Sequence, residues 1–129
     1  MAFDFPASYR YADSHEYAWQ DADKIRIGLS AYAVDQLGDI VFVDLPEVGA
    51  ALSRGNSFGT VESVKAVEEM YAPLTGEVLQ RNESLLANPE ELQKDPHGEG
   101  WLLVMRPSDL TQLEQLMDST TYAAKVAAN

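Results

Sequence analysis

The sequence has 129 residues, 46% of them hydrophobic, and it carries a net charge of −12 with a pI near 4.3. At about 150 residues per domain, this length predicts one domain spanning residues 1–129. The absence of cysteine excludes disulfides, thiolate metal sites and a cysteine nucleophile. The strong negative charge disfavours binding to nucleic acid or to an anionic membrane, because both repel an acidic surface.

The remaining composition narrows the class of protein further. The only histidines are His15 and His97, too few for a multi-histidine metal centre. Apolar runs such as Trp101–Met105 are too short to span a bilayer, and Met1–Arg10 lacks the apolar core of a secretory signal. We therefore expect a cytoplasmic protein without a resident metal and without a membrane or nucleic-acid partner.

The first third of the chain reads as two strands and a helix. We expect an opening strand over Tyr11–Gln20. Lys24–Leu29 alternates strictly, with three apolar residues on one face, which is typical of a half-buried strand. Ser30 is a suitable N-cap for a helix over Ala31–Leu37, and Gly38 can end that helix in a left-handed conformation.

The middle of the chain is dominated by strands. The run Ile40–Val43 within Asp39–Leu45 predicts a strand buried on both faces. Ser57–Val64 and Met70–Leu74 read as the two arms of a hairpin, and Thr75-Gly76 then turns the chain into a strand over Glu77–Gln80.

The last third ends in helices. Asn88–Leu92 reads as a turn or short helix, and the loop Asp95–Gly100 leads into a strand over Trp101–Met105. Pro107-Ser108 opens a helix, and the alanine-rich segment Thr120–Asn129 forms a last one. Short strands separated by frequent turns predict a mainly β fold, a small sandwich or barrel with peripheral short helices and a C-terminal helix.

Ser14, His15 and Glu16 are the residue types of a hydrolase triad. Neighbouring side chains in a strand point to opposite faces, so His15 cannot form the hydrogen bonds to both Ser14 and Glu16 that a catalytic triad needs. Ser14 and Glu16 share one face. We therefore reject the triad, and we expect His97, in a Pro/Gly loop, to be solvated.

Lys65 is the unusual residue of the predicted hairpin. It is one of only four lysines, and it lies at the hairpin tip. Its neighbours Val64, Ala66 and Val67 are apolar where a tip is usually polar. Such a surface suits recognition by another protein. The amine can also be acylated, which removes its charge.

The lysine segment closely resembles the lipoyl-attachment segment of the glycine cleavage system H-protein family. Nearly the whole chain shares the resemblance, in the family's order. The matching segments are Ser14–Glu16, Ile27–Ser30, Leu37–Pro46, Phe58–Ala66, Ala72–Val78 and Glu99–Leu102.

The resemblance implies a barrel-sandwich hybrid fold, as in lipoyl and biotinyl carriers, with lipoic acid covalently bound to Lys65. It implies a non-catalytic shuttle that carries an aminomethyl group from a pyridoxal-phosphate glycine decarboxylase to a tetrahydrofolate-dependent aminomethyltransferase. Reducing equivalents then pass to dihydrolipoyl dehydrogenase, and a lipoylating enzyme loads the lysine. We expect a monomer. The lack of cysteine agrees with redox sulfur that arrives as a modification.

The resemblance also implies a cleft that holds the aminomethyl group. The positions that match the family's serine, glutamate and aspartate are Ser14, Glu16 and Glu69. Glu69 departs from the family, since glutamate replaces aspartate and adds one methylene.

Three alternatives remain. Biotinyl carriers flank their lysine with methionines, whereas Val64 and Ala66 flank it here. A lipoyl domain of a 2-oxo-acid dehydrogenase complex would be smaller and would be followed by a linker, whereas this sequence ends at Asn129. An unmodified scaffold, or a protein that only relays lipoyl groups, would keep the same fold.

Overall fold

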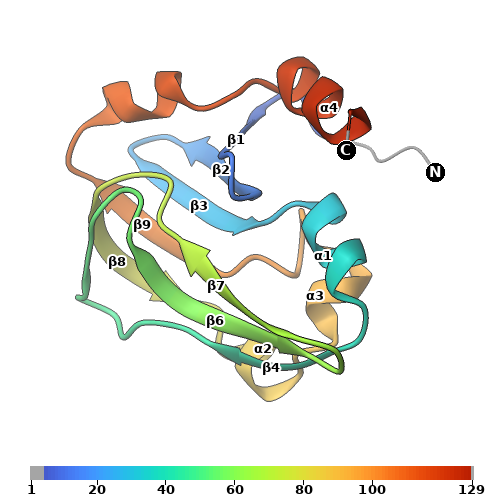
Figure 1. Cartoon of the computed structure of the whole chain (residues 1–129). Helices are drawn as coiled ribbons and strands as arrows, with labels where there is room; N and C mark the ends of the chain where they lie inside the picture. Colours follow the sequence, from blue (N-terminus) through green and yellow to red (C-terminus); the bar gives the residue numbers. More distant parts are fainter. Residues whose placement is uncertain (1–4, 129) are drawn as a thin grey trace.

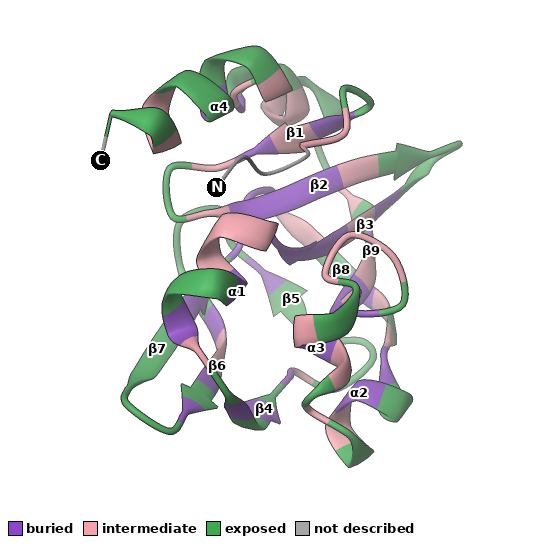
Figure 2. Cartoon of the chain, turned by 90° about the vertical axis from the view of Figure 1, so that its right-hand side faces the viewer, coloured by how far each residue is buried: buried purple, intermediate pink, exposed green. Residues whose placement is uncertain are grey.

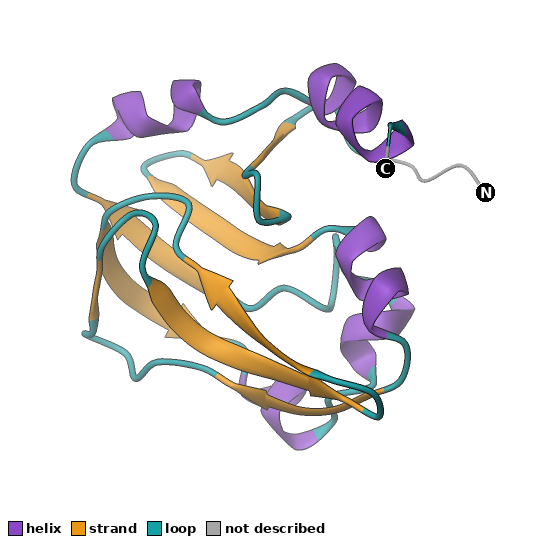
Figure 3. Cartoon of the chain, viewed as in Figure 1, coloured by secondary structure: helices purple, strands orange, loops and turns teal. Residues whose placement is uncertain are grey.

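The computed structural model describes residues 5–128, which form two antiparallel sheets with short helices around them (Figures 1 and 3). The larger sheet has the strand order β1 (Tyr9–Tyr11), β2 (Glu16–Asp21), β3 (Lys24–Leu29), β9 (Leu103–Pro107), β8 (Gly76–Arg81), β5 (Ala51–Leu52). The smaller sheet has the order β4 (Ile40–Asp44), β6 (Ser57–Ser63), β7 (Val67–Tyr71). The predicted mainly β class is confirmed.

The two sheets share one apolar core. In β3, Ile25, Ile27 and Leu29 are buried, as their alternation predicts. They belong to the same cluster as Val61 and Met70 of the smaller sheet. Burying a side chain of this size contributes about 1.5–3 kcal/mol, so the packing of the two sheets is the main source of stability. Figure 2 shows the buried segments of the strands, while the outer turns of the helices stay exposed.

The opening strand is interrupted, which corrects the prediction of one strand over Tyr11–Gln20. β1 ends at Tyr11 and β2 begins at Glu16. Between them His15 has a φ of 79°, in the left-handed region, so the chain turns instead of continuing as a strand.

The prediction of a strand buried on both faces at Ile40–Val43 is also wrong. Only Ile40 and Val43 are buried, whereas Val41 and Phe42 are about half exposed, at 49% and 52%. The pairing of β4 with β6 shifts between Ile40 and Phe42. A shift of this kind inserts an extra residue and re-aims the side chains that follow.

The lysine hairpin and the first helix are confirmed, although the second arm of the hairpin is β7 (Val67–Tyr71) and not the predicted Met70–Leu74. β6 and β7 pair as the two arms, and Val64 to Ala66 form the tip. Helix α1 (Ala31–Leu37) begins at Ser30, whose hydroxyl accepts a hydrogen bond from the Ala33 N–H, and Gly38 follows it with a φ of 78°.

The other helices are short. The chain continues after β8 into α2 (Glu83–Ala87), which the sequence reading missed, and α3 (Glu91–Lys94). The helix expected after Pro107 is a 3₁₀ helix, η1 (Leu110–Gln115), and α4 (Ser119–Ala127) is the expected last helix. Within residues 5–128, no helix is both long enough and apolar enough to cross a membrane.

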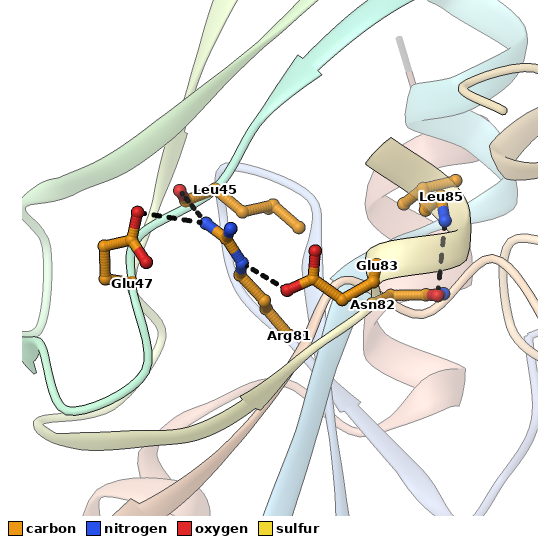
Figure 4. A network of polar contacts seen from close by, with 6 residues as sticks. All are labelled: Leu45, Glu47, Arg81, Asn82, Glu83 and Leu85. Atoms are coloured by element: carbon orange, nitrogen blue, oxygen red, sulfur yellow. Dashed lines mark hydrogen bonds and ion pairs between the residues drawn. The ribbon is translucent and has the colours of Figure 1, made fainter. Parts of the chain in front are cut away.

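Polar side chains hold the start of α2 in place (Figure 4). Arg81 forms ion pairs with Glu83 at 2.7 Å and Glu47 at 3.6 Å. The buried Asn82 caps the helix by accepting from the Leu85 N–H. Its amide also donates to the carbonyls of Glu99 at 3.0 Å and Trp101 at 2.7 Å. One side chain therefore joins α2 to the loop before β9.

A second, aromatic cluster packs the C-terminal helix onto β1 and β2. Its buried members are Tyr9, Tyr11, Tyr17 and Tyr122. His97 lies against their rings, and its Nε2 accepts a hydrogen bond from the Ala31 N–H at 3.2 Å. The prediction of a solvated His97 is therefore wrong, because the loop folds back onto the start of α1.

We expect Asn82→Ala to lower the free energy of unfolding by about 2–4 kcal/mol, because it removes a helix cap and leaves two carbonyls without their donor. Urea unfolding monitored by circular dichroism measures this loss. The matched control is Asn88→Ala, which removes one exposed amide at the end of α2 and should cost under about 0.5 kcal/mol. Equal losses in the two variants would contradict the assignment.

Candidate functional site

The tip that carries Lys65 is ordered by the buried Ser63. The Ser63 hydroxyl accepts hydrogen bonds from the N–H groups of Lys65 at 3.3 Å and Ala66 at 3.2 Å. The Val64 N–H donates to the Asp39 carbonyl at 3.0 Å, which ties the tip to the turn after α1. The Lys65 side chain itself is exposed, so the backbone is fixed while the amine stays accessible.

A cleft of about 410 Å³ lies beside this tip. Its walls come from α1, the turn before β2, and strands β3, β6 and β7. The apolar side chains that line it are Leu29, Ala33, Leu37, Val61 and Met70. The polar ones include Ser14, His15, Glu16, Tyr32, Gln36, Lys65, Glu68 and Glu69. The cleft thus combines apolar side chains with a group of acidic ones.

Glu16 is the buried acid of this cleft, with 1% of its surface exposed. Its carboxylate accepts a hydrogen bond from the Tyr71 N–H at 2.9 Å and a short one from the Ser14 hydroxyl. Burial raises the pKa of Glu16 to about 7, although the bonds from Ser14 and Tyr71 oppose this shift.

No lysine, arginine or histidine among residues 5–128 forms an ion pair with Glu16. When Glu16 is ionised, its negative charge is therefore held by hydrogen bonds alone. A buried carboxylate in this state gains strongly from a cation that enters beside it, because the interior screens the charges weakly. The geometry suits a small ammonium group.

The four residues singled out by sequence, Ser14, Glu16, Lys65 and Glu69, all line this one cleft. They come from the turn before β2, from β2 itself, from the hairpin tip and from β7. Ser14 and Glu16 are in direct contact. Glu69 is exposed.

The sequence reading missed several of the residues that line the cleft. Glu68 lines the cleft as well as Glu69, and α1 contributes Ala33 and Leu37. The spacing of these two α1 residues by four positions is the signal that could have found this face, since such residues share one side of a helix.

His15 does not form a catalytic triad with its neighbours. Its Nδ1 lies 2.7 Å from the Tyr122 hydroxyl, while Ser14 donates directly to Glu16. Burial, with Lys125 nearby, lowers the pKa of His15, and Asp13 partly opposes this. Within residues 5–128, no three histidine, aspartate or glutamate side chains gather as metal ligands.

Comparisons with known proteins agree with one another. The sequence model of the family described as "Glycine cleavage H-protein" matches residues 9–129. A glycine cleavage system H protein of Synechococcus sp. (strain WH7803) is 84% identical over 99% of each chain. One from Prochlorococcus marinus (strain NATL2A) is 66% identical over 99% of this chain and 100% of its own. The crystal structure of one from Mycobacterium marinum matches with a TM-score of 0.88 and 35% identity, covering 95% of this chain and 99% of that one.

The burial of Glu16 predicts a pH dependence of stability. Between pH 4.5 and about 7 the folded protein binds more protons at Glu16 than the unfolded chain does, so the free energy of unfolding falls as the pH rises through this window. Glu16→Gln removes this contribution, and its stability should fall by about 2–3 kcal/mol less than the wild type's between pH 5 and pH 8. Urea unfolding at the two pH values measures the difference.

The control for this measurement is Glu62→Gln, which changes an exposed glutamate outside the cleft and should keep the wild-type pH dependence. An unchanged pH dependence in Glu16→Gln would show that Glu16 titrates normally.

Proposed function

Since the chain belongs to the glycine cleavage H-protein family, which consists of lipoyl carriers and not of catalysts, we propose that lipoic acid is bound in amide linkage to the Nζ of Lys65. We propose further that the carrier takes an aminomethyl group from glycine decarboxylase to the aminomethyltransferase. The observation that carries the proposal is that Lys65 and the buried Glu16 line the same cleft.

The position of Lys65 supports its assignment as the attachment site. The amine lies at a tip whose backbone is fixed by Ser63, so a lipoylating enzyme meets a defined shape. The other lysines, Lys24, Lys94 and Lys125, lie on β3, α3 and α4, and none of them lines the cleft.

The cleft also fits the group that Lys65 would carry. Its apolar wall suits an aliphatic chain, and its volume lies at the lower end of the usual range for small-ligand sites, about 300–1,000 Å³. When bound, lipoic acid supplies the sulfur and redox chemistry that a chain without cysteine lacks. The protein's own part is to bind the loaded arm and to exclude water from its end.

Glu16 would hold the cargo amine. An amine that stays protonated keeps its lone pair unavailable for expelling the sulfur, so pairing with a carboxylate protects the cargo from hydrolysis. Glu16 offers such a carboxylate in a water-poor wall, with Ser14 fixing one of its oxygens. Glu69, on the exposed wall, would act as a weaker second acceptor.

The proposed partners are glycine decarboxylase, the tetrahydrofolate-dependent aminomethyltransferase, dihydrolipoyl dehydrogenase and a lipoylating enzyme. The exposed apolar residues around the lysine, Val64 at 70% and Val67 at 62%, support protein recognition at the tip. Each partner must reach the same lysine, so the contacts must be brief and exclusive of one another.

We expect Lys65→Arg to abolish lipoylation, because the guanidinium keeps the positive charge but offers no acylatable amine. Intact-mass measurement after expression with a lipoylating enzyme should show one lipoyl group on the wild type and none on the variant. Lys94→Arg is the matched control and should be fully lipoylated. Lipoylation that persists in Lys65→Arg contradicts the site, and a wild type that stays unmodified supports the scaffold alternative.

We expect Glu16→Gln to release the cargo of the loaded carrier about 10- to 100-fold faster than the wild type, since it loses a charge-assisted hydrogen bond of about 1.5–3 kcal/mol. Formaldehyde released from the isolated loaded carrier measures the rate. Glu69→Gln should accelerate release only about twofold, because exposed charges interact weakly. The exposed Glu62→Gln should have no effect. Equal rates in all four proteins would place the cargo elsewhere.

A further inference from the structure

The turn that places Ser14 on Glu16 is centred on a strained residue. His15 has a φ of 79°, a value that residues other than glycine rarely adopt. Backbone hydrogen bonds hold both sides of it, from the His15 N–H to the Ala12 carbonyl and from the Ser30 N–H to the His15 carbonyl, each 2.9 Å long. A strained residue persists only when its surroundings fix it, so the contacts of the His15 side chain matter as well.

The imidazole is the end of a chain of buried hydroxyl groups. Its Nδ1 lies 2.7 Å from the Tyr122 hydroxyl, which lies 2.6 Å from the Ser30 hydroxyl. The Ser30 hydroxyl in turn accepts from the Ala33 N–H at 3.2 Å, at the start of α1. Ser30 and Tyr122 are both completely buried, so water cannot replace either hydroxyl group.

The direction of these hydrogen bonds follows from counting hydrogens. Ser30 donates to Tyr122, and Tyr122 donates to Nδ1 of His15; this is the arrangement that gives every hydroxyl hydrogen an acceptor. Among residues 5–128, the reverse direction would leave the hydrogen of the buried Ser30 hydroxyl without an acceptor. This series of hydrogen bonds therefore requires a neutral His15 whose ring hydrogen is on Nε2.

The charges around His15 agree with a neutral ring. Lys125 of α4 lies nearby and pairs with Asp13 at 2.9 Å, and the Tyr32 ring lies 5.1 Å from the imidazole. Burial lowers the pKa of His15 and raises that of Tyr122 to about 12, so the Tyr122 hydroxyl keeps its hydrogen near neutral pH.

Tyr122 is held rigidly, although it does not line the cleft. Its ring stacks on Tyr11, with centroids 4.5 Å apart, and meets the edge of Phe5 at 4.9 Å. Figure 2 shows α4, which carries Tyr122, lying beside β1. The aromatic cluster therefore fixes the Tyr122 hydroxyl beside the His15 imidazole.

We infer that Tyr122 of the C-terminal helix is a positioning residue for the cargo site, because its hydroxyl, supported by Ser30, holds His15 in the left-handed turn that keeps Ser14 on Glu16. This inference rests on the proposed function, because only that function makes Glu16 a cargo site. The effect of Tyr122 on the turn can nevertheless be tested in the lipoyl-free protein. Helix α4 thus supports the cleft through Tyr122, although none of its residues lines the cleft.

The first experiment compares Tyr122→Phe with Tyr9→Phe in the lipoyl-free protein. Both variants keep an aromatic ring of the same cluster and lose one hydroxyl; the Tyr9 hydroxyl donates to the His97 carbonyl at 2.7 Å. Nitrogen-15 NMR should show the Nε2–H form of His15 in the wild type and in Tyr9→Phe, and a mixture of both tautomers in Tyr122→Phe. Carbon-13 NMR should show a lower titration midpoint of Glu16 in Tyr122→Phe alone, as water reaches the loosened turn.

The second experiment measures cargo release from the loaded carrier. We expect Tyr122→Phe to accelerate formaldehyde release about threefold to tenfold, in line with one lost hydrogen bond, and Tyr9→Phe to leave it unchanged. Lipoylation of Lys65 should proceed at the wild-type rate in both, because Ser63 and not Tyr122 orders the tip.

A double variant tests the route through His15. Glycine adopts a φ of 79° without strain and has no imidazole to hold. In a His15→Gly background, Tyr122→Phe should therefore have no further effect on the Glu16 titration or on cargo release.

The inference is overturned if Tyr122→Phe leaves the His15 tautomer and the Glu16 titration unchanged. It is also overturned if Tyr9→Phe reproduces both changes, or if Tyr122→Phe keeps its full effect beside His15→Gly. If the NMR changes appear but Glu16→Gln does not alter cargo release, the proposed cargo site fails while the control of the turn by Tyr122 stands.

Discussion

The hydrogen bond from the Tyr71 N–H to the Glu16 carboxylate joins the two sheets at the cleft. β7 is the edge strand of the smaller sheet, and an edge strand exposes backbone groups that need partners. Glu16, from β2 of the larger sheet, supplies one. The same contact buries a carboxylate, so the joint between the sheets and the acidic group of the site are one feature. Any change at Glu16 therefore acts on stability and on the site together.

The two ends of the cleft differ in a way that suits a carrier. At the hairpin tip the backbone is fixed by Ser63 while the Lys65 amine and the neighbouring valines are exposed. Within the cleft, Glu16 is buried and held by hydrogen bonds. The exposed tip is open to contact with other proteins, whereas the charge of the buried carboxylate is poorly screened by water. The accessible lysine and the protected carboxylate thus lie at different places in one cleft.

The periphery of the fold supports this arrangement. Asn82 joins α2 to the loop before β9, and His97 brings the preceding loop onto the start of α1. The aromatic cluster docks α4 against β1. Each contact comes from residues far apart in the sequence. The short helices therefore do more than cover the sheets, because α1 lines the cleft and Tyr122 of α4 contacts His15 in its wall.

The sequence alone determined the local elements and singled out Lys65 as the candidate attachment lysine. The strict alternation of Lys24–Leu29 and the cap at Ser30 specify a strand and a helix because both depend on near neighbours. The lysine hairpin, and the family to which it points, were likewise readable from a continuous segment.

The tertiary structure decided what depends on distant partners. The left-handed turn at His15, the outward side chains of Val41 and Phe42 and the inward position of His97 reverse the local expectation. The unusual pKa of Glu16 belongs to the same group. None of these can be read from neighbouring residues, because burial, hydrogen-bond partners and β-bulges are set by packing between segments, and the free energy of a strained turn or a buried charge is balanced only by contacts that folding creates.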